Sequence, residues 1–158
     1  LISNNATRAE INEAVKNIET KVVDLETGEI RTEINPDDFD AVKASKDSKR
    51  NTMIPSSKDG AGIKKRSKLE KIYYVKDNGE ITQVVLPVNG KGLWSTLYGF
   101  MALTPDTKTV LGLGFYQHGE TPGLGGEVDN PKWKAQWAGK TAFDNEWNPV
   151  LKVIKGSV

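Results

Sequence analysis

The chain has 158 residues, of which 37% are hydrophobic and 27% are charged, values typical of one soluble globular domain with a single core. Its net charge of +1 gives no overall field that would attract nucleic acid or anionic lipid. The sequence contains no cysteine and one histidine, His118, which excludes disulfides, thiolate catalysis and clusters of cysteine or histidine metal ligands within the chain.

No apolar run approaches the roughly 18 to 20 residues that a membrane-spanning helix needs, and no signal peptide is recognisable. The chain opens at Leu1 rather than at methionine, and it stops at Val158 just after a Gly-Ser pair. We therefore expect it to be a fragment of a longer protein, with segments missing at both ends.

The first 42 residues predict a helix, a hairpin and the start of a second helix. Thr7 followed by Glu10 fits a capping box that opens a helix over 7–19. Residues 21–34 predict two short strands around a turn at Gly28. The stretch Asn-Pro-Asp-Asp that follows predicts a short helix over 39–44.

Residues 43–70 form a polar segment with unusual charge. The stretch from Lys43 to Lys71 holds ten basic and three acidic residues, a net charge of +7, whereas the remainder holds 12 basic and 18 acidic residues, a net charge of −6. The stretch has almost no aromatic residues, which a nucleic-acid surface would interleave for stacking. It predicts a solvated, mobile loop, and we expect no nucleic-acid partner.

Strand signals dominate residues 71–158, which we interpret as the core of the domain. Asp77-Asn78-Gly79 predicts a tight hairpin turn. Strands are predicted over 71–76, 80–87, 109–117 and 150–154, with a loop over 88–92. Pro131 opens a helix predicted over 131–138. The segment 93–103 is compatible with a helical turn or a buried strand. Because strands come mainly as hairpins, residues 1–158 predict a single α+β domain with a mainly antiparallel twisted sheet and flanking helices.

Two segments carry functional information. The first is Gly-Lys-Gly-Leu-Trp-Ser-Thr-Leu-Tyr-Gly-Phe over 90–100, and the second is Gly-Glu-Thr-Pro-Gly-Leu-Gly-Gly-Glu over 119–127. Glycines allow a backbone to approach a ligand closely, and proline stiffens the loop. The second segment lacks the Lys-Ser/Thr pair of a phosphate loop and does not match the dinucleotide fingerprint. From the residues alone, a rigid connector between a strand and a helix is the favoured interpretation.

Glu120-Thr121-Pro122-Gly123-Leu124-Gly125 resembles the characteristic loop of the FMN-binding domain family. That family includes the C subunits of Na+-translocating NADH:quinone reductases and the G subunits of the related Rnf electron-transport complexes. The element Gly-Leu-Trp-Ser over 92–95 and the tryptophan-rich stretch 130–140 resemble the quinone reductase branch. The resemblance is dense over 73–156 and thinner over 22–29.

The resemblance implies FMN as cofactor and an electron-transfer role in a Na+-pumping reductase, with no catalytic acid or base and no metal site in this chain. It implies that Glu120, Thr121, Gly123, Leu124 and Gly125 line the flavin, and that Leu93, Trp94 and Ser95 form the opposite wall. Trp133 is expected in the core.

Family members are anchored in the bacterial inner membrane by an N-terminal helix, face the periplasm and contact other membrane subunits. They carry FMN on a threonine within a Ser-Gly-Ala-Thr-x-Thr motif, which these 158 residues lack. We therefore expect the acceptor threonine to lie outside the fragment, and FMN to be absent or weakly held here. Two alternatives remain open: an Rnf-type electron-transport protein, and a non-redox docking module of a membrane complex.

Overall fold

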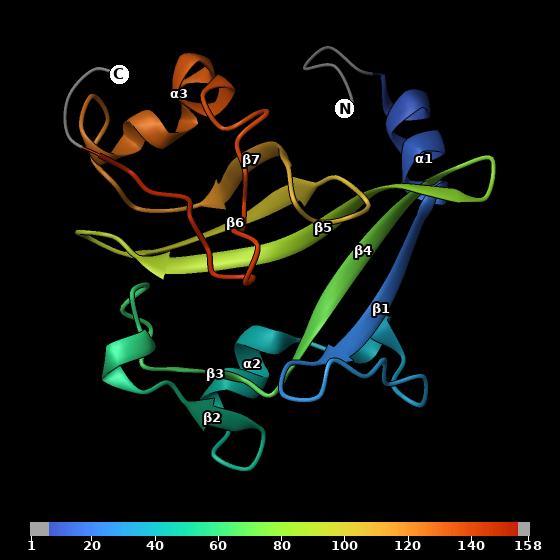
Figure 1. The fold of residues 1–158 in the computed structure, drawn as a ribbon, viewed down its shortest axis with the longest axis horizontal. Helices are drawn as coiled ribbons and strands as arrows, with labels where there is room; N and C mark the ends of the chain where they lie inside the picture. Colours follow the sequence, from blue (N-terminus) through green and yellow to red (C-terminus); the bar gives the residue numbers. More distant parts are fainter. Residues whose placement is uncertain (1–6, 155–158) are drawn as a thin grey trace.

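The computed structural model describes residues 7–154. Its main sheet has five strands in the order β1-β4-β5-β6-β7, and every neighbouring pair is antiparallel. The strands are β1 (Ile18–Asp24), β4 (Leu69–Asp77), β5 (Glu80–Lys91), β6 (Thr96–Leu103) and β7 (Val110–Gln117). The strong twist is visible where β1 and β4 run steeply across the direction of β5 to β7 (Figure 1). The predicted α+β architecture with an antiparallel sheet is confirmed.

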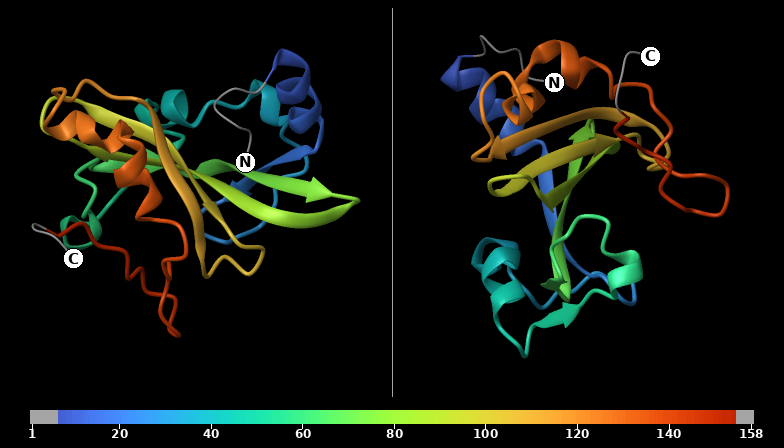
Figure 2. Two further views of the ribbon diagram at one scale, coloured as in Figure 1. Left: turned by 90° about the horizontal axis from the view of Figure 1, so that it is seen from above. Right: turned by 90° about the vertical axis from the view of Figure 1, so that its left-hand side faces the viewer.

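Helical elements lie on both sides of this sheet (Figures 1 and 2). On one side lie the 3-10 helix η3 (Gly125–Asp129) and the helix α3 (Pro131–Ala135). On the other lie α2 (Ala41–Lys46) and a small sheet of β2 (Asn51–Met53) and β3 (Lys65–Ser67). Two apolar clusters fill the two sides. One is built on Val22, Phe39 and Ala44, and the other on Leu103, Val110 and Ala142.

The N-terminal helix α1 (Arg8–Lys16) is opened by the predicted capping box, in which the Thr7 hydroxyl and the Glu10 carboxylate each accept from the other's backbone N–H. The helix is shorter than predicted, because Ile18 and Glu19 belong to β1. The Asn17 carbonyl accepts from the N–H of Lys76 at 2.8 Å. Hydrogen bonding to β4 therefore starts at Asn17 and prevents a further helical turn.

The predicted turn at Gly28 is present, with φ of 76°, and the Asp24 carboxylate accepts from the N–H groups of Glu26 and Thr27. The second strand of that hairpin is reduced to one bridge between Val23 and Ile30. The helix predicted over 39–44 is split into the 3-10 helix η1 (Pro36–Asp38) and α2, because the Asp40 carboxylate caps the N–H of residue 43 at 2.9 Å.

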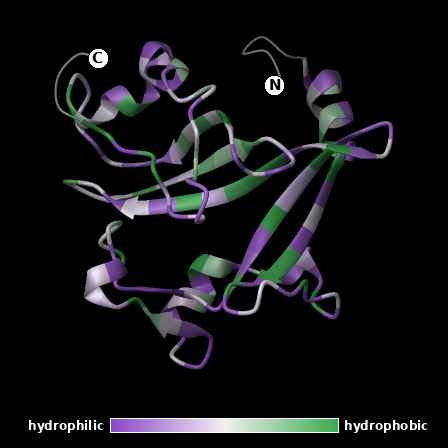
Figure 3. Cartoon of the chain, in the orientation of Figure 1, coloured by the Kyte–Doolittle hydropathy of each residue, from purple (hydrophilic) through white to green (hydrophobic). Residues whose placement is uncertain are grey.

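The prediction of a long loop over 43–70 was wrong. This segment contains the end of α2, the β2–β3 sheet and the 3-10 helix η2 (Ser56–Lys58). Ala44 and Ser67 are buried, and the N–H of Lys68 donates to the carbonyl of Arg50 at 3.0 Å. Most of the segment is hydrophilic (Figure 3), because its cationic side chains extend into water. Strands of three residues are too short to produce a periodic sequence signal.

The hairpin turn between β4 and β5 is confirmed, with Asn78 and Gly79 at φ of 50° and 86°. Residues 88–91 are not a loop, because β5 continues to Lys91 opposite Thr96 of β6. The ambiguous segment 93–103 is a turn followed by strand β6. No strand forms over 150–154, since Pro149 bridges Phe143 without an N–H of its own to extend a ladder. Likewise, α3 ends at Ala135 rather than at residue 138.

One exposed charge cluster joins β1 to β4. The Glu19 carboxylate lies 2.7 Å from the ammonium of Lys21 and 2.5 Å from that of Lys76. Hydrogen bonds from Lys21 and then Lys76 lower the pKa of Glu19 to about 2. None of the helices within residues 7–154 has the length and apolar character required to cross a bilayer.

Candidate functional site

The two segments singled out in the sequence lie side by side at one edge of the sheet. Residues 92–95 form the tip of the β5–β6 hairpin, where the N–H of Gly92 donates to the carbonyl of Ser95 at 2.7 Å. The glycine-rich loop, residues 119–126, follows the end of β7. Because Tyr98 near the start of β6 pairs with Gln117 at the end of β7, sheet register alone brings the hairpin tip next to the glycine-rich loop.

The Glu120 carboxylate fastens the loop to the hairpin tip. One oxygen, Oε1, accepts from the N–H groups of Trp94 at 3.1 Å and Ser95 at 3.2 Å, and Oε2 accepts from the N–H of Leu93 at 3.3 Å. Three successive N–H groups therefore converge on one carboxylate, an arrangement that favours an anion. The hydrogen bond from Trp94, followed by those from Ser95 and Leu93, lowers the pKa of Glu120.

Ser95 adds a second connection between the same two segments. Its Oγ accepts from the N–H of Gly119 at 2.7 Å and lies 3.4 Å from the carbonyl of Thr96. The packing leaves little room for side chains on the backbone. A Cβ on Gly92 would lie 2.8 Å from Cδ of Glu120, and one on Gly125 would lie 2.8 Å from Oε2 of Glu120. Two of the motif glycines are thus required by the close approach of Glu120.

His118 and Asp129 connect the two ends of the glycine-rich segment. The Nε2 of His118 lies 2.7 Å from a carboxylate oxygen of Asp129, and Nδ1 accepts from the N–H of Glu120 at 3.2 Å. With Nδ1 as acceptor, the neutral imidazole carries its proton on Nε2 and donates it to Asp129. Within the loop, the carbonyl of Thr121 accepts from residues 124 and 126, and Gly123 has φ of 75°. The loop is therefore fixed by its own backbone.

Beside this loop lies an apolar groove of about 410 Å³. Its walls are β7, the start of η3 and the helix α3. Phe115 lies 6.4 Å from Trp133, and Trp133 lies 5.3 Å from Trp137, between ring centroids. The groove is lined by Leu113, Phe115, Leu124, Gly125, Glu127, Val128, Trp133, Trp137 and Val153. A neighbouring hollow of about 280 Å³ shares Leu113 and Phe115 and extends toward β5.

All the site residues predicted from the sequence lie in one region of the structure, but they do not form a single wall of the groove. Leu124 and Gly125 line the groove, and Leu124 is 74% exposed. Leu93 and Trp94 are 80% and 70% exposed at the hairpin tip and do not line it. The Glu120 carboxylate is directed at the hairpin backbone, and Thr121 and Gly123 lie on the exposed turn. That these eight residues contact a flavin stays a prediction.

Sequence reasoning missed the floor and the far wall of the groove. Leu113 and Phe115 lie on the groove side of β7, and Trp133 and Trp137 are four residues apart on and just after α3. Both spacings were present as signals, because alternate residues share a face of a strand and residues four apart share a face of a helix. Trp133, expected in the core, is half-buried and open to the groove.

Comparison with known proteins agrees with this geometry. The FMN-binding domain family matches the chain over residues 92–155, which includes the hairpin tip, the glycine-rich loop and α3. The solved structure of Shewanella oneidensis NqrC superposes with a TM-score of 0.87 and 34% sequence identity, over 99% of this chain and 71% of that one. The chain belongs to the NqrC family of FMN-binding domains. The predicted family resemblance is confirmed.

Curated NqrC relatives share still more sequence. The C subunit of the Na(+)-translocating NADH-quinone reductase of Pseudomonas aeruginosa is 52% identical over 141 residues, and that of Pasteurella multocida is 49% identical over 142 residues. Each alignment covers 89% of this chain and 54% of the relative, so the chain spans about half the length of these relatives.

Residues 7–154 contain no group of three or more His, Asp or Glu side chains placed to hold a metal ion.

Proposed function

We propose that this NqrC-family chain is the flavin-binding region of an electron-transfer component of a Na+-translocating NADH:quinone reductase, and that the isoalloxazine of FMN lies in the groove beside the glycine-rich loop. The observation that carries the proposal is the groove itself. It joins an aromatic floor and wall to a clamped loop, inside the segment that matches the FMN-binding domain family. Its volume of about 410 Å³ lies within the range of small-molecule sites.

The residues fit the chemistry of a flavin. Phe115, Trp133 and Trp137 offer ring faces to a flat heteroaromatic system, and Leu124 offers an exposed apolar contact. No hydrogen bond within residues 7–154 uses the backbone N–H of Thr121 or Gly123, so both remain available to ring carbonyl oxygens. When bound, FMN supplies the electron transfer, while the protein binds and orients the ring and limits its contact with water.

We extend the proposal to the setting of the reductase. The chain is proposed to face the periplasm at the bacterial inner membrane, in contact with the other subunits, and to carry FMN on a threonine outside residues 1–158. The relatives' names, which denote the C subunit of a Na(+)-translocating NADH-quinone reductase, support the membrane setting. Because no Ser-Gly-Ala-Thr stretch occurs in these residues, the groove can be tested with free FMN.

The test is a titration of the 158-residue chain with FMN, monitored by quenching of flavin fluorescence. We expect saturable quenching that weakens when Leu124 or Phe115 is replaced by alanine. Met53→Ala is the matched control, because Met53 is 68% exposed on β2, on the other side of the sheet. Absence of saturable quenching, or equal loss in the Met53 variant, would refute the assignment of the groove.

One observation favours docking as a second function of the same region. Leu93 and Trp94 expose 80% and 70% of their surface at the hairpin tip, and large exposed apolar side chains that cluster mark interaction sites. If the hairpin tip only docks another protein of the reductase, Trp94→Ala leaves FMN quenching unchanged and weakens binding of the other reductase subunits. If Trp94 also covers the flavin, the same substitution weakens both.

A further inference from the structure

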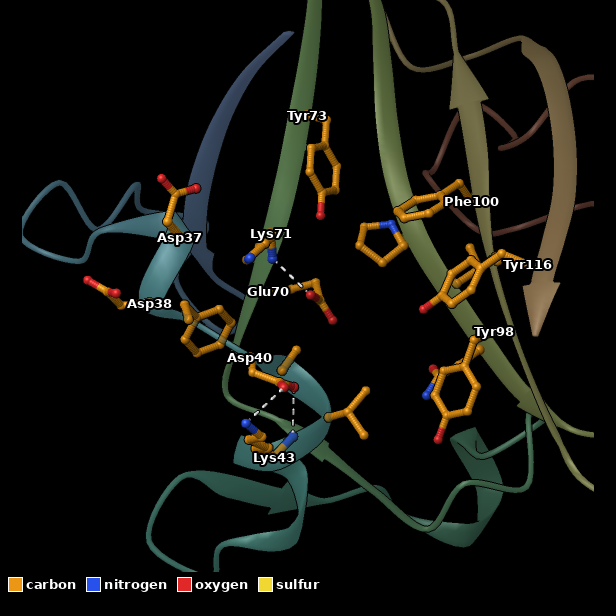
Figure 4. Close-up of a pocket in the computed structure, with 17 residues that line it drawn as sticks. Asp37, Asp38, Asp40, Lys43, Glu70, Lys71, Tyr73, Tyr98, Phe100 and Tyr116 are labelled. Atoms are coloured by element: carbon orange, nitrogen blue, oxygen red, sulfur yellow. Dashed lines mark hydrogen bonds and ion pairs between the residues drawn. The ribbon is translucent and has the colours of Figure 1, made fainter. Parts of the chain in front are cut away.

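Another hollow, of about 470 Å³, is drawn in Figure 4, and it lies on the opposite side of the sheet from the groove proposed for the flavin. We call it the tyrosine cleft, after Tyr73, Tyr98 and Tyr116, which line it together with Phe100. Consecutive residues of a strand face opposite sides. Phe115 accordingly lines the groove, and its neighbour Tyr116 lines the tyrosine cleft. The far wall is formed by α2 and the residues just before it.

The aromatic wall of the tyrosine cleft is continuous. Tyr73 meets Phe100 edge to face at 5.7 Å between ring centroids, and Phe100 lies 5.3 Å from Tyr116. Within the described part of the chain, no hydrogen bond uses the hydroxyl of Tyr73, Tyr98 or Tyr116. Figure 4 shows the hydroxyl groups of Tyr73 and Tyr116 directed into the space between the two walls. The wall therefore offers electron-rich ring faces and free hydroxyl oxygens.

A half-buried carboxylate that forms no ion pair within residues 7–154, that of Glu70, lies between these walls. Glu70 Oε1 accepts from the backbone N–H of Lys71 at 2.8 Å. No ammonium or guanidinium group among residues 7–154 lies within ion-pair distance of Glu70. Loss of solvent raises the pKa of Glu70, and the charge of Asp40 adds a smaller increase, while the N–H and the ammonium charge of Lys71 oppose both.

The lining as a whole favours a cation. Four acidic residues line the tyrosine cleft against two lysines, which leaves a net charge of −2; they are Asp37, Asp38, Asp40, Glu70, Lys43 and Lys71. The closest carboxylate–ammonium pair among them joins Asp40 and Lys43 at 3.9 Å. An anion placed here would meet uncompensated negative charge, and a neutral apolar group would leave the Glu70 carboxylate desolvated and unpaired.

We propose that the tyrosine cleft binds the guanidinium group of an arginine side chain on a partner protein. A guanidinium is flat, weakly hydrated and always charged, so it stacks on tyrosine and phenylalanine rings while donating to a carboxylate. In the tyrosine cleft it stacks against Phe100 or Tyr116, and its N–H groups donate to Glu70 and to a tyrosine hydroxyl. A lysine ammonium satisfies the carboxylate but has no plane to stack.

The probe is N-acetyl-arginine amide, and the matched control probe is N-acetyl-citrulline amide, which keeps the shape and loses the charge. Binding is monitored by NMR chemical shifts of the 158-residue chain. We expect arginine to shift Tyr73, Phe100 and Tyr116 signals saturably and citrulline to leave them unchanged. Glu70→Gln should weaken binding about tenfold, the effect of removing one charge-assisted hydrogen bond. Glu80→Gln, at the exposed start of β5, should not change it.

A second variant guards against a general structural effect. Phe100→Leu removes a ring from the wall while Glu70 remains, and we expect binding to weaken about two- to fivefold. Thermal unfolding of both variants establishes that they are folded at the titration temperature. Equal affinity for the two probes, or wild-type affinity in folded Glu70→Gln, would overturn the proposal. Free arginine that binds at least as tightly as the blocked amide would overturn its assignment to a partner's side chain. The flavin titration has an independent readout, so either proposal can fail alone.

Discussion

Two leucines distinguish the requirements of folding from those of the flavin groove. Leu103 is completely buried at the end of β6, in the cluster that it shares with Val110 and Ala142. Leu103→Ala leaves a cavity in this cluster, and we expect a loss of about 3 kcal/mol in the free energy of unfolding, within the range of about 2–5 kcal/mol for buried leucines. For a domain of this size, the midpoint of thermal unfolding should fall by about 6–12 °C.

Leu124 is the matched position, because it has the same side chain at 74% exposure. Leu124→Ala should change the free energy of unfolding by less than about 0.5 kcal/mol and should weaken FMN quenching. Urea denaturation monitored by circular dichroism measures the first quantity, and the fluorescence titration measures the second. The reasoning is refuted if Leu103→Ala costs no more stability than Leu124→Ala, or if the exposed leucine affects folding and leaves flavin binding intact.

Three further outcomes are expected. Glu120→Gln should accelerate amide exchange at the hairpin tip. Because the folded state lowers the pKa of Glu120, the carboxylate's contribution to stability is present above the unfolded pKa of about 4.5 and is lost as the pH falls through the folded pKa. Unchanged exchange in the variant would contradict this. For Glu19, NMR should give a titration midpoint of about 2, and the stability that its ionised form contributes should be lost between about pH 4.5 and 2. High salt should return the midpoint toward 4.5. A midpoint near 4.5 at low salt would argue against the two ion pairs. Gly123→Ala should lower the free energy of unfolding by about 1–2 kcal/mol because φ is 75° there, whereas Gly112→Ala, with open space at its Cβ, should not; equal effects in a denaturation series would contradict the strain argument.

Features determined by neighbouring residues could be predicted from the sequence. The capping box of Thr7 and the turn at Asn78 and Gly79 are fixed by contacts over three or four residues, and both are present. The family resemblance rested on three short motifs, the glycine-rich loop, residues 92–95 and the tryptophan-rich stretch 130–140, each of which can be read from neighbouring residues. The β2–β3 sheet escaped prediction, because each strand has three residues and its stability depends on packing against α2 rather than on sequence pattern.

The candidate site likewise combines features that neighbouring residues determine with features that depend on residues far apart in the sequence. The sequence indicated that Glu120 and Trp94 belong to one region, but it could not show that the carboxylate of one binds the backbone N–H of the other across 26 residues. The groove depends on β7 presenting Phe115 toward Trp133, a contact fixed by sheet register. The tyrosine cleft collects residues from β4, β6, β7 and the segment around α2, and no local pattern connects such distant residues.

The clamp between Glu120 and the hairpin tip uses only main-chain donors on the hairpin side. The side chains of Leu93 and Trp94 take no part in it and are free to change without releasing the loop. Substitutions of these two side chains can therefore change what the hairpin tip contacts while the clamp on the loop is kept. The backbone N–H groups of Leu93 and Trp94 hold the loop in place, whereas their side chains form the exposed surface of the hairpin tip. The two features can therefore evolve separately.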